Sequence, residues 1–286
     1  MLGAAGQLGG DLIEAGRARG DRMTALTRAE CDITSRADVD RAIDGARGAD
    51  AVINCAGWTR VDAAEDHEDE AAAVNAAGAG IVAAACAAAG LRLCHMSTDY
   101  VFDGDATEPI DESARPAPRT AYGRTKLQGE LAVAERCPDH LIVRTSWLFG
   151  RQGPNFVLTI LRLAANRPEV RVVGDQRGTP TWTGHLAPAI LRLIEIGSPG
   201  TYHLTNSGTA TWHELAVAAV ERAGLTTRVV PITTAEYPTA ARRPPYSVLD
   251  NRRWRELGEN PLPAWELGLA SYLATLPPGA GQMSGA

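Results

Sequence analysis

Tyr122 and Lys126 are the two side chains of this sequence whose types and spacing best suit proton transfer. They lie four residues apart in a stretch expected to be helical, residues 120–135, so both fall on one helix face. A phenol can give its proton to a developing alkoxide, and an adjacent ammonium favours the phenolate that remains. The pair therefore predicts a site that reduces a ketone.

Ser97 and Thr98 follow the apolar run 92–96, which we expect to be a buried strand. Active sites of parallel α/β sheets lie at the carboxyl ends of the strands, so these hydroxyls can reach a substrate oxygen there. Taken singly, a Tyr and Lys at this spacing are usually a packed aromatic and a surface charge, and Thr98 suits a turn cap. Three fitting groups at one sheet end favour the catalytic interpretation.

Gly3, Gly6 and Gly9 are spaced three apart and open directly into the helical run 11–18. Small residues let a backbone approach a pyrophosphate at a helix N-terminus, so the loop predicts dinucleotide binding. About 20 residues beyond the glycines, where ribose selectivity is set, Arg28 suits the 2′-phosphate of NADPH and Glu30 suits the 2′-hydroxyl of NADH. The sequence leaves that choice open.

The first half of the chain alternates apolar runs with helical ones, which predicts an α/β fold: a Rossmann-type doubly wound parallel sheet. After Gly150, shorter elements and many prolines indicate a smaller α+β substrate lobe. We expect a dinucleotide-binding domain with the catalytic residues over 1–150, a mainly substrate-binding lobe over 151–276 with some segments returning to the first domain, and a flexible tail over 277–286. The expected strands are 23–26, 51–54, 92–96, 141–144, 170–173 and 202–204, and the expected helices are 11–18, 37–46, 71–89, 120–135, 186–196 and 212–223.

Only Met1 and Leu2 precede Gly3, although a strand should precede such a loop. The strand before the loop is central in a doubly wound sheet, and without it the neighbouring strands would be unpaired. We therefore expect that the first strand is clipped and that the natural protein starts several residues upstream.

Composition narrows the possible partners and location. A net charge of -6 and a pI near 5.6, with no basic stripe, argue against nucleic acid. The five scattered cysteines lack metal-binding spacing and are expected to be reduced core thiols. The Ala/Gly-rich run 71–91, broken by Asn75, suits a packed helix better than a membrane span, and no export signal is recognisable. We expect a cytoplasmic protein without membrane contact.

Three longer motifs make a family resemblance specific. Ser-Thr-Asp-Tyr-Val-Phe-Asp-Gly at 97–104, Tyr-Gly-Arg-Thr-Lys at 122–126 and Arg-Thr-Ser-Trp at 144–147 resemble the dTDP-4-dehydrorhamnose reductases of the extended short-chain dehydrogenase superfamily. Further similar stretches, at 6–9, 155–156, 175–181 and 241–244, extend the resemblance almost end to end. The first motif is the most specific, because the whole superfamily shares the glycine loop and the Tyr/Lys pair.

The resemblance implies hydride transfer from NADPH or NADH to C4 of dTDP-4-dehydro-6-deoxy-L-mannose, giving dTDP-L-rhamnose. Tyr122 would then be the acid, Thr98 would orient the ketone, and Lys126 would lower the pKa of the phenol and anchor the ribose. Asn75 would support a proton path. The implied cofactor-binding residues are Gly3, Gly6, Gln7, Leu8, Arg28, Asp32, Ile33, Ala56, Gly57, Asn75, Tyr122 and Lys126.

The implied partner is a dTDP-linked 4-keto-6-deoxy sugar, bound by a monomer or a homodimer. Arg242 or Arg243 could neutralise its diphosphate. Some family members bridge a dimer through magnesium, but no carboxylate pair follows Pro180 here and Asp11 alone is insufficient, so we predict no metal. The implied substrate-binding residues are Thr98, Asp99, Tyr100, Trp147, Asn155, Phe156 and Arg242.

Four alternatives remain. Another dTDP-4-keto-6-deoxysugar ketoreductase of secondary metabolism would share all these motifs. A 4,6-dehydratase is disfavoured because Tyr100 stands where such enzymes carry an acid, and an epimerase would have to retain its cofactor tightly. A non-catalytic NADP-binding regulatory subunit, like those of methionine adenosyltransferase, is disfavoured by the intact Thr98, Tyr122 and Lys126.

Overall fold

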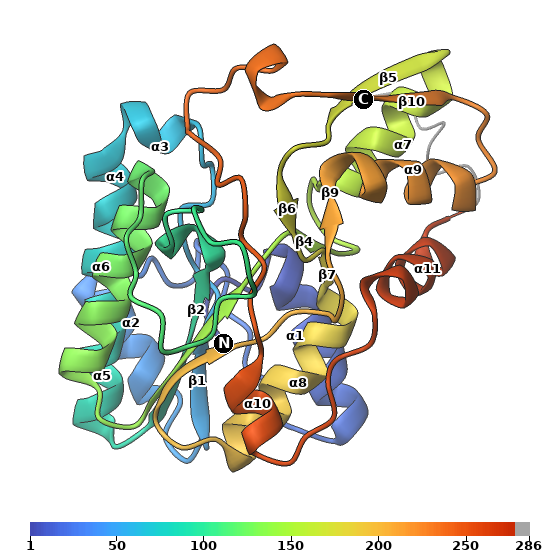
Figure 1. Ribbon diagram of the computed structural model, residues 1–286. Helices are drawn as coiled ribbons and strands as arrows, with labels where there is room; N and C mark the ends of the chain where they lie inside the picture. The colour runs from blue at the N-terminus through green and yellow to red at the C-terminus, as the bar shows by residue number, and fades with distance from the viewer. Residues whose placement is uncertain (278–286) are drawn as a thin grey trace.

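Short apolar runs form a central parallel sheet, whose strands are buried on both faces as parallel sheets require (Figure 1). The computed structural model describes residues 1–277. The sheet confirms the strands expected at 51–54, 92–96 and 141–144, and its fourth strand overlaps the one expected at 202–204. In spatial order its strands are β1 (Ala51–Asn54), β2 (Arg92–Thr98), β3 (His140–Thr145) and β8 (Gly200–His203).

Helices cover the two faces of the sheet and bury two separate cores. On one face α1 (Gln7–Arg19) packs beside α8 (Thr183–Ile196), over side chains that include Ile53, Leu141 and Val143. The other face carries α2, α5 and α6 over Val52, Leu93 and Ile142. These three helices are α2 (Arg36–Asp44), α5 (Ala79–Ala89) and α6 (Ala121–Arg136).

Met1 and Leu2 fill the place of the expected central first strand. Leu2 donates its backbone N–H to Ile53 O at 2.9 Å and accepts from Cys55 N at 3.0 Å, while Leu26 N donates to Met1 O at 2.9 Å. Leu2 thus bridges Leu26 and β1 in parallel register, and the neighbours that we expected to be unpaired are paired. The strand expected over 23–26 is reduced to the single bridge at Leu26.

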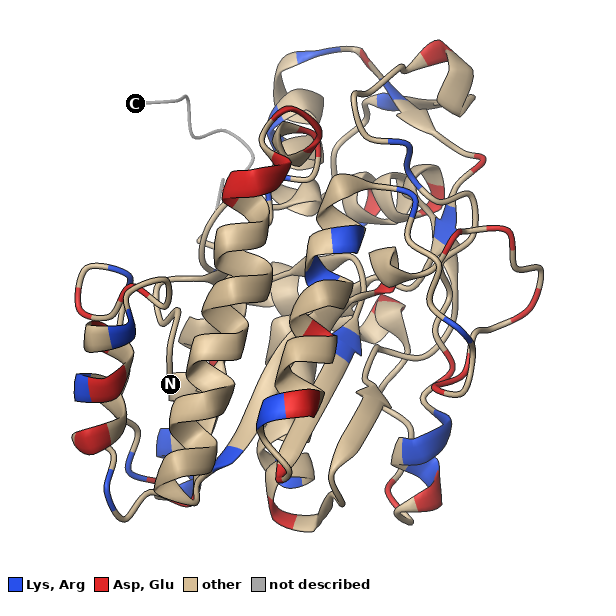
Figure 2. Ribbon diagram, turned by 90° about the vertical axis from the view of Figure 1, so that its left-hand side faces the viewer, with Lys and Arg blue, Asp and Glu red and all other residues tan. Residues whose placement is uncertain are grey.

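The apolar run expected as one helix over 71–89 is a helix in three parts, residues 68–89: α4 (Glu68–Ala72), the π-helical η1 (Ala73–Gly78) and α5. Within residues 1–277 it is the one helix long and apolar enough to cross a membrane. It packs against α2 and α6, and Figure 2 shows charged residues only at its first turns. Half of its most apolar window is buried, as expected for a core helix.

A smaller part of the chain packs its own core at one end of the sheet (Figure 1), with Phe149, Val157 and Leu269 fully buried. The strand expected at 170–173 and the helix expected at 212–223 lie here. Its elements are α7 (Phe156–Asn166), β5 (Glu169–Val173) paired with β10 (Arg228–Ile232), α9 (Trp212–Arg222) and α11 (Trp265–Thr275), with short pairings of β4 (Leu148–Phe149) with β7 (Thr181–Trp182) and of β6 (Arg177–Gly178) with β9 (Ala210–Thr211).

Two expected pieces of the substrate lobe belong elsewhere. The helix at 186–196 is part of α8, which packs on α1, and the strand at 202–204 overlaps β8, which pairs with β3. Sequence periodicity predicted both element types but not their packing partners, which only the return of the chain to the sheet determines. The remaining short elements are α3 (Ala63–Asp66), η2 (Asp99–Val101), η3 (Thr234–Glu236) and α10 (Arg252–Glu256).

The expected boundary at 150 stays a prediction. The expected tail lies outside the described residues except for Pro277. All five cysteines are free thiols, and Cys55 is the half-buried one.

Candidate active site

The glycine loop lies against the end of β1, as close backbone packing requires. Gly3 has a φ of 77°, and a Cβ on it would stand 2.6 Å from the backbone nitrogen of Ala56. Beside it runs a groove of about 250 Å³ at the carboxyl ends of the first strands. Most of the predicted cofactor-binding residues line this groove: Gly3, Gly6, Arg28, Asp32, Ile33, Ala56 and Gly57.

Gln7 and Leu8 turn their side chains away from the groove. Gln7 Nε2 donates to Pro154 O, and Leu8 is buried in the core between α1 and the sheet. A dinucleotide could therefore meet these two residues only through their backbone N–H groups at the start of α1.

The side chains of Arg28 and Glu30 differ in whether they are available to bind a ligand. The Arg28 side chain is 84% exposed beside the groove and reaches Asp32 at 3.3 Å. Glu30 accepts from the backbone N–H and the hydroxyl of Thr27, both at 2.8 Å, and these bonds lower the pKa of its carboxyl. Glu30 is thus committed to its own turn, whereas Arg28 remains available to an anionic ligand.

Thr98, Tyr122 and Lys126 converge beside this groove. Thr98 ends β2, while Tyr122 and Lys126 occupy successive turns of α6, whose N-terminus is capped by Thr120. All three predicted catalytic side chains are less than one-tenth exposed. The glycine loop connects to them through Ala56 and its neighbour Gly57, because a Cβ on Gly57 would lie 4.0 Å from Lys126 Nζ.

Lys126 is a buried ammonium without a direct carboxylate partner in the described chain. Its Nζ donates to Met96 O at 2.6 Å and lies 3.5 Å from His95 Nε2. Burial lowers the pKa of Lys126 to about 8, and the negative charge of Glu130 is the strongest opposing influence. The ammonium is thus close to the point at which it loses its charge.

The phenol of Tyr122 does not show the lowered pKa that we expected. Burial raises the pKa of Tyr122 to about 12, and the neighbouring Thr98 hydroxyl opposes that rise only in part. The Lys126 ammonium is directed at Met96 O and does not offset the burial. In this state Tyr122 is a protonated phenol at neutral pH, which is the form that an acid needs.

Asn75 lies in the π-helical turn and is fully hydrogen-bonded. Its Oδ1 accepts from Trp58 N at 2.8 Å, and its Nδ2 donates to Trp58 O and to Thr125 Oγ1, both at 3.1 Å. A Cβ on Gly57 would lie 3.2 Å from its Oδ1. Asn75 therefore lies near Lys126 and supports the Gly57–Trp58 turn.

Asp99 is a buried acid next to Thr98. Thr98 Oγ1 donates to Asp99 Oδ1 at 3.0 Å and accepts from Tyr100 N at 3.2 Å. Burial raises the pKa of Asp99 to about 6, more than the nearby hydroxyls of Ser247 and Thr98 lower it. Its Oδ2 and the Ser247 hydroxyl are buried without a hydrogen-bond partner within residues 1–277. No motif in the sequence pointed to Ser247.

Aromatic side chains form a wall further along the chain. Trp147, with a φ of 48°, stacks on Trp212 at 3.5 Å with the rings 2° from parallel, and Phe156 meets Trp212 at 4.6 Å. A second contact places the Tyr100 ring edge-on to Tyr122 at 5.5 Å. The sequence missed Trp212, because a Trp at the start of a helix resembles any core aromatic.

Of the three other predicted or suggested substrate residues, Asn155 and Arg243 are hydrogen-bonded within the protein, and Arg242 is exposed. Asn155 caps α7 by accepting from Leu158 N at 3.0 Å and also donates to Gly150 O and Tyr272 Oη. Arg243 forms a bidentate ion pair with Asp62, at 2.6 and 2.7 Å. Arg242 is exposed.

No group of three or more His, Cys, Asp or Glu within residues 1–277 is placed to hold a metal ion. The carboxylate of Asp11 accepts hydrogen bonds from Arg151 and Thr183, so it is not free to bind a metal ion.

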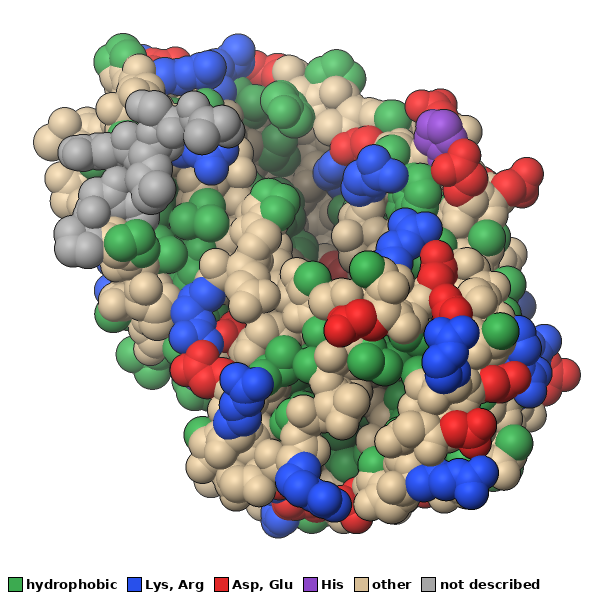
Figure 3. Space-filling model, turned by 180° about the vertical axis from the view of Figure 1, so that it is seen from behind, with side chains coloured by type: hydrophobic (Ala, Val, Ile, Leu, Met, Phe, Trp, Pro, Cys, Tyr) green, Lys and Arg blue, Asp and Glu red, His purple; other side chains and the backbone are tan. Residues whose placement is uncertain are grey.

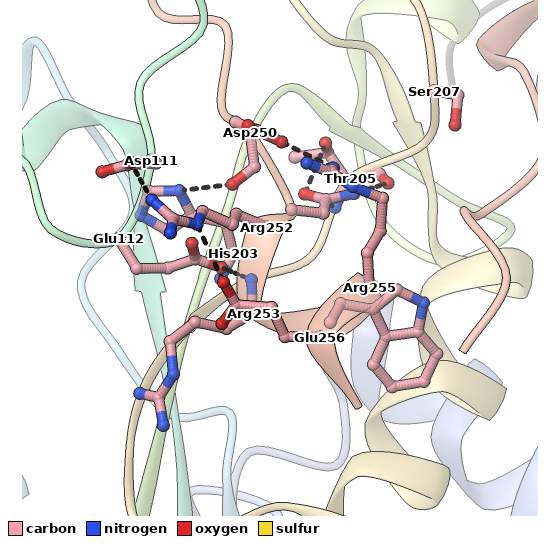
Figure 4. Close-up of polar contacts among 12 residues, drawn as sticks. Asp111, Glu112, His203, Thr205, Ser207, Asp250, Arg252, Arg253, Arg255 and Glu256 are labelled. Carbon is pink, nitrogen blue, oxygen red and sulfur yellow. Dashed lines mark hydrogen bonds and ion pairs between the residues drawn. The ribbon is translucent and has the colours of Figure 1, made fainter. Parts of the chain in front are cut away.

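A second cavity, of about 440 Å³, lies near the start of β8, away from the strand ends that carry the predicted residues. Figure 4 shows Arg252 of its lining paired with Asp111 and Glu256. Arg252 Nη1 donates to Asp111 at 3.3 Å, and Glu112 Oε1 accepts from the backbone N–H groups of His203 and Arg253 at 3.0 and 3.2 Å. These contacts fasten α10 and the loop around Glu112 to β8. Seen from behind Figure 1, the surface is hollowed near its upper middle, with hydrophobic and charged side chains at the rim (Figure 3).

Comparisons with known proteins agree with the geometry. The family model described as RmlD substrate binding domain matches residues 1–277. A dTDP-4-dehydrorhamnose reductase of Streptomyces griseus is 44% identical, covering 96% of this chain and 93% of that protein. A dTDP-4-keto-6-deoxy-D-glucose reductase of Streptomyces niveus is also 44% identical, covering 96% of each.

Solved structures extend this likeness to the fold. A crystal structure of dTDP-4-dehydrorhamnose reductase from Bacillus anthracis in complex with NADP superimposes with a TM-score of 0.93 at 39% identity, covering 96% of this chain and 98% of that chain. One from Clostridium acetobutylicum gives 0.92 at 38% identity, covering 96% and 97%. The expected Rossmann-type fold is thereby confirmed, and the chain belongs to the dTDP-4-dehydrorhamnose reductase (RmlD) family.

Proposed function

We propose that this protein uses NADPH or NADH to reduce the C4 ketone of dTDP-4-dehydro-6-deoxy-L-mannose, producing dTDP-L-rhamnose. The observation that carries the proposal is the convergence of Thr98, Tyr122 and Lys126 beside a glycine-lined groove. The reductase names of relatives at 44% identity support it. A location in the cytoplasm as a monomer or homodimer is part of the same proposal, as is a division into a dinucleotide-binding domain over 1–150 and a mainly substrate-binding lobe after it.

The residues of the groove fit a dinucleotide. Gly3 could not carry a Cβ without striking the backbone of Ala56, so a glycine here lets the loop that lines the groove pack against the end of β1. Arg28 offers a largely exposed guanidinium, paired through Nε with Asp32 at 3.3 Å, where a 2′-phosphate would lie, which favours NADPH over NADH. When bound, the nicotinamide supplies the hydride.

The chain's own groups handle the proton. Tyr122 Oη, protonated at neutral pH, donates its proton to the ketone oxygen as negative charge develops there. Thr98 Oγ1 would orient that oxygen by turning its hydroxyl from Asp99 Oδ1 to the substrate. The N–H donors of Lys126 that do not reach Met96 O would hold the ribose and stabilise the phenolate left behind. Asp99, Tyr100 and the Trp147 wall are proposed to surround the sugar and its nucleotide, with exposed Arg242 near the diphosphate.

A second candidate is reduction of another dTDP-4-keto-6-deoxy sugar. The Streptomyces niveus relative, a dTDP-4-keto-6-deoxy-D-glucose reductase, is as similar to this chain as the dTDP-4-dehydrorhamnose reductases are. Both reactions need the same proton donor and differ in the sugar that the wall accepts.

The test supplies purified protein with dTDP-4-keto-6-deoxy-L-mannose and with its D-gluco counterpart, each with NADPH and with NADH. We expect absorbance loss from NADPH with the L-sugar, and NMR should identify the product as dTDP-L-rhamnose. Tyr122→Phe should reduce kcat about 10²- to 10⁴-fold while NADPH still binds. Turnover of the D-sugar alone would move the assignment to the second candidate, and full activity of Tyr122→Phe would contradict the assigned acid.

A further inference from the structure

The carboxylate of Glu130 lies where three segments that carry predicted site residues meet. Glu130 is on α6, one turn beyond Lys126. Its Oε1 accepts from Ser97 Oγ of β2 at 2.5 Å and from Arg144 Nε of β3 at 2.9 Å, and its Oε2 accepts from Arg144 Nη2 at 2.6 Å. The relative exposures of Ser97, Glu130 and Arg144 are 6%, 4% and 5%, so water cannot replace these bonds.

Each partner of Glu130 adjoins a residue of the site. Ser97 directly precedes Thr98, and Arg144 begins the segment that leads to Trp147. Charge-assisted hydrogen bonds of this kind are short and directional, so α6 cannot slide along the sheet without breaking one. Buried ion pairs often add no net stability, because desolvation offsets the attraction. A role in geometry therefore explains this pair better than a role in stability.

We propose that Glu130 is a positioning residue: it fixes the helix that carries Tyr122 and Lys126 against the strand that carries Thr98. The expected change in kcat rests on the proposed reductase function. The expected change in the charge of Lys126 does not, because it can be followed through NADPH binding alone.

Glu130 also acts on the charge of Lys126. The titratable groups around that ammonium are Glu130 and Tyr122 on its own helix, His95 on β2 and Cys55 just beyond β1. His95 is neutral, because burial holds its pKa well below the usual value. Glu130 is the largest influence that raises the pKa of Lys126, so neutralising it should let that pKa fall below about 8.

The test compares Glu130→Gln, the milder Ser97→Ala and the control Asp139→Asn. Asp139 pairs with Arg92 at 2.8 Å at the opposite end of the same two strands, so its loss perturbs the sheet without touching the site. For each variant, kcat, KM and the Kd of NADPH are measured from about pH 6 to about pH 9, after thermal unfolding has shown that it is folded at the assay temperature.

For Glu130→Gln we expect kcat to fall about 10-fold at neutral pH with little change in the KM for the sugar. The loss should grow with pH, because Lys126 loses its proton earlier, and NADPH binding should weaken at a lower pH than in the wild type. Ser97→Ala should lose about threefold in kcat with an unshifted pH profile, and Asp139→Asn should match the wild type.

Two results would overturn the proposal: unchanged kcat in both Glu130→Gln and Ser97→Ala, or a loss in Glu130→Gln that is equal at every pH and equal to that of Asp139→Asn. If Glu130→Gln does not fold, Ser97→Ala alone decides, and an unchanged kcat in it refutes the positioning role. A wild-type protein that binds NADPH but reduces no sugar would refute the reductase function instead, and the pH dependence of NADPH binding would still decide the role of Glu130.

Discussion

Two buried cations near the site have opposite surroundings. Arg144 and Lys126 are each 5% exposed, yet Arg144 is bidentate to Glu130 and lies 5.1 Å from the Phe102 ring, whereas Lys126 reaches only a carbonyl and a neutral imidazole. The fold uses Arg144 to join a helix to a strand. It leaves the Lys126 ammonium with donors to spare beside the groove, where a ligand can use them.

The sharpest test of this contrast replaces each cation with Met. Arg144→Met should lower the free energy of unfolding by about 3–5 kcal/mol, because Glu130 would be left as an unpaired buried charge. Denaturant unfolding at neutral pH measures the loss. Asp139→Asn, which breaks a more exposed ion pair of the same sheet and leaves Arg92 its bonds to Ile194 O and Gly197 O, should lose no more than about 1 kcal/mol. If both variants lost the same free energy of unfolding, burial of the Arg144–Glu130 pair would make no difference to stability, and the contrast would be wrong.

Lys126→Met should change stability in the opposite direction. The pKa of Lys126 in the folded protein, about 8, lies below the usual lysine pKa of 10.5, so the charged form destabilises the folded protein at neutral pH. The cost is at most roughly 3 kcal/mol, is complete below about pH 8 and disappears as the pH approaches 10.5. We therefore expect cofactor-free Lys126→Met to melt higher than the wild type at neutral pH, by a margin that shrinks above pH 8. A lower melting temperature at neutral pH would mean that the ammonium is stabilising.

Local motifs at strand ends could be predicted from the sequence, whereas contacts between distant segments could not. Thr98, Tyr122 and Lys126 were found because a strand end and a helix start are both visible in the sequence. Ser247 reaches the site from a segment far along the chain, and Trp212 stacks on Trp147 beside the core of the smaller part of the chain. The direction of the Tyr122 pKa was missed because it depends on burial, which spacing does not reveal.

Replacing Arg28 should have the smallest effect on stability, because its guanidinium is exposed whereas Arg144 and Lys126 are buried. Its side chain is 84% exposed, so Arg28→Ala should leave the stability unchanged within about 0.5 kcal/mol. The KM for NADPH should rise about three- to tenfold while the KM for NADH stays constant, since only NADPH carries the 2′-phosphate. Steady-state kinetics with both cofactors measures this; a parallel rise for NADH would remove Arg28 from the ribose site.

The function proposed for the site around Lys126 is the reduction of a sugar ketone with a hydride from NADPH. Transfer of deuterium from C4-deuterated NADPH to the sugar tests this function directly. We expect one deuteron at C4 of dTDP-L-rhamnose, read by NMR, and about 10²- to 10⁴-fold less of this labelled product from Tyr122→Phe over the same time. A product labelled from solvent at C4 or C5, with NADPH unconsumed, would contradict the proposed function.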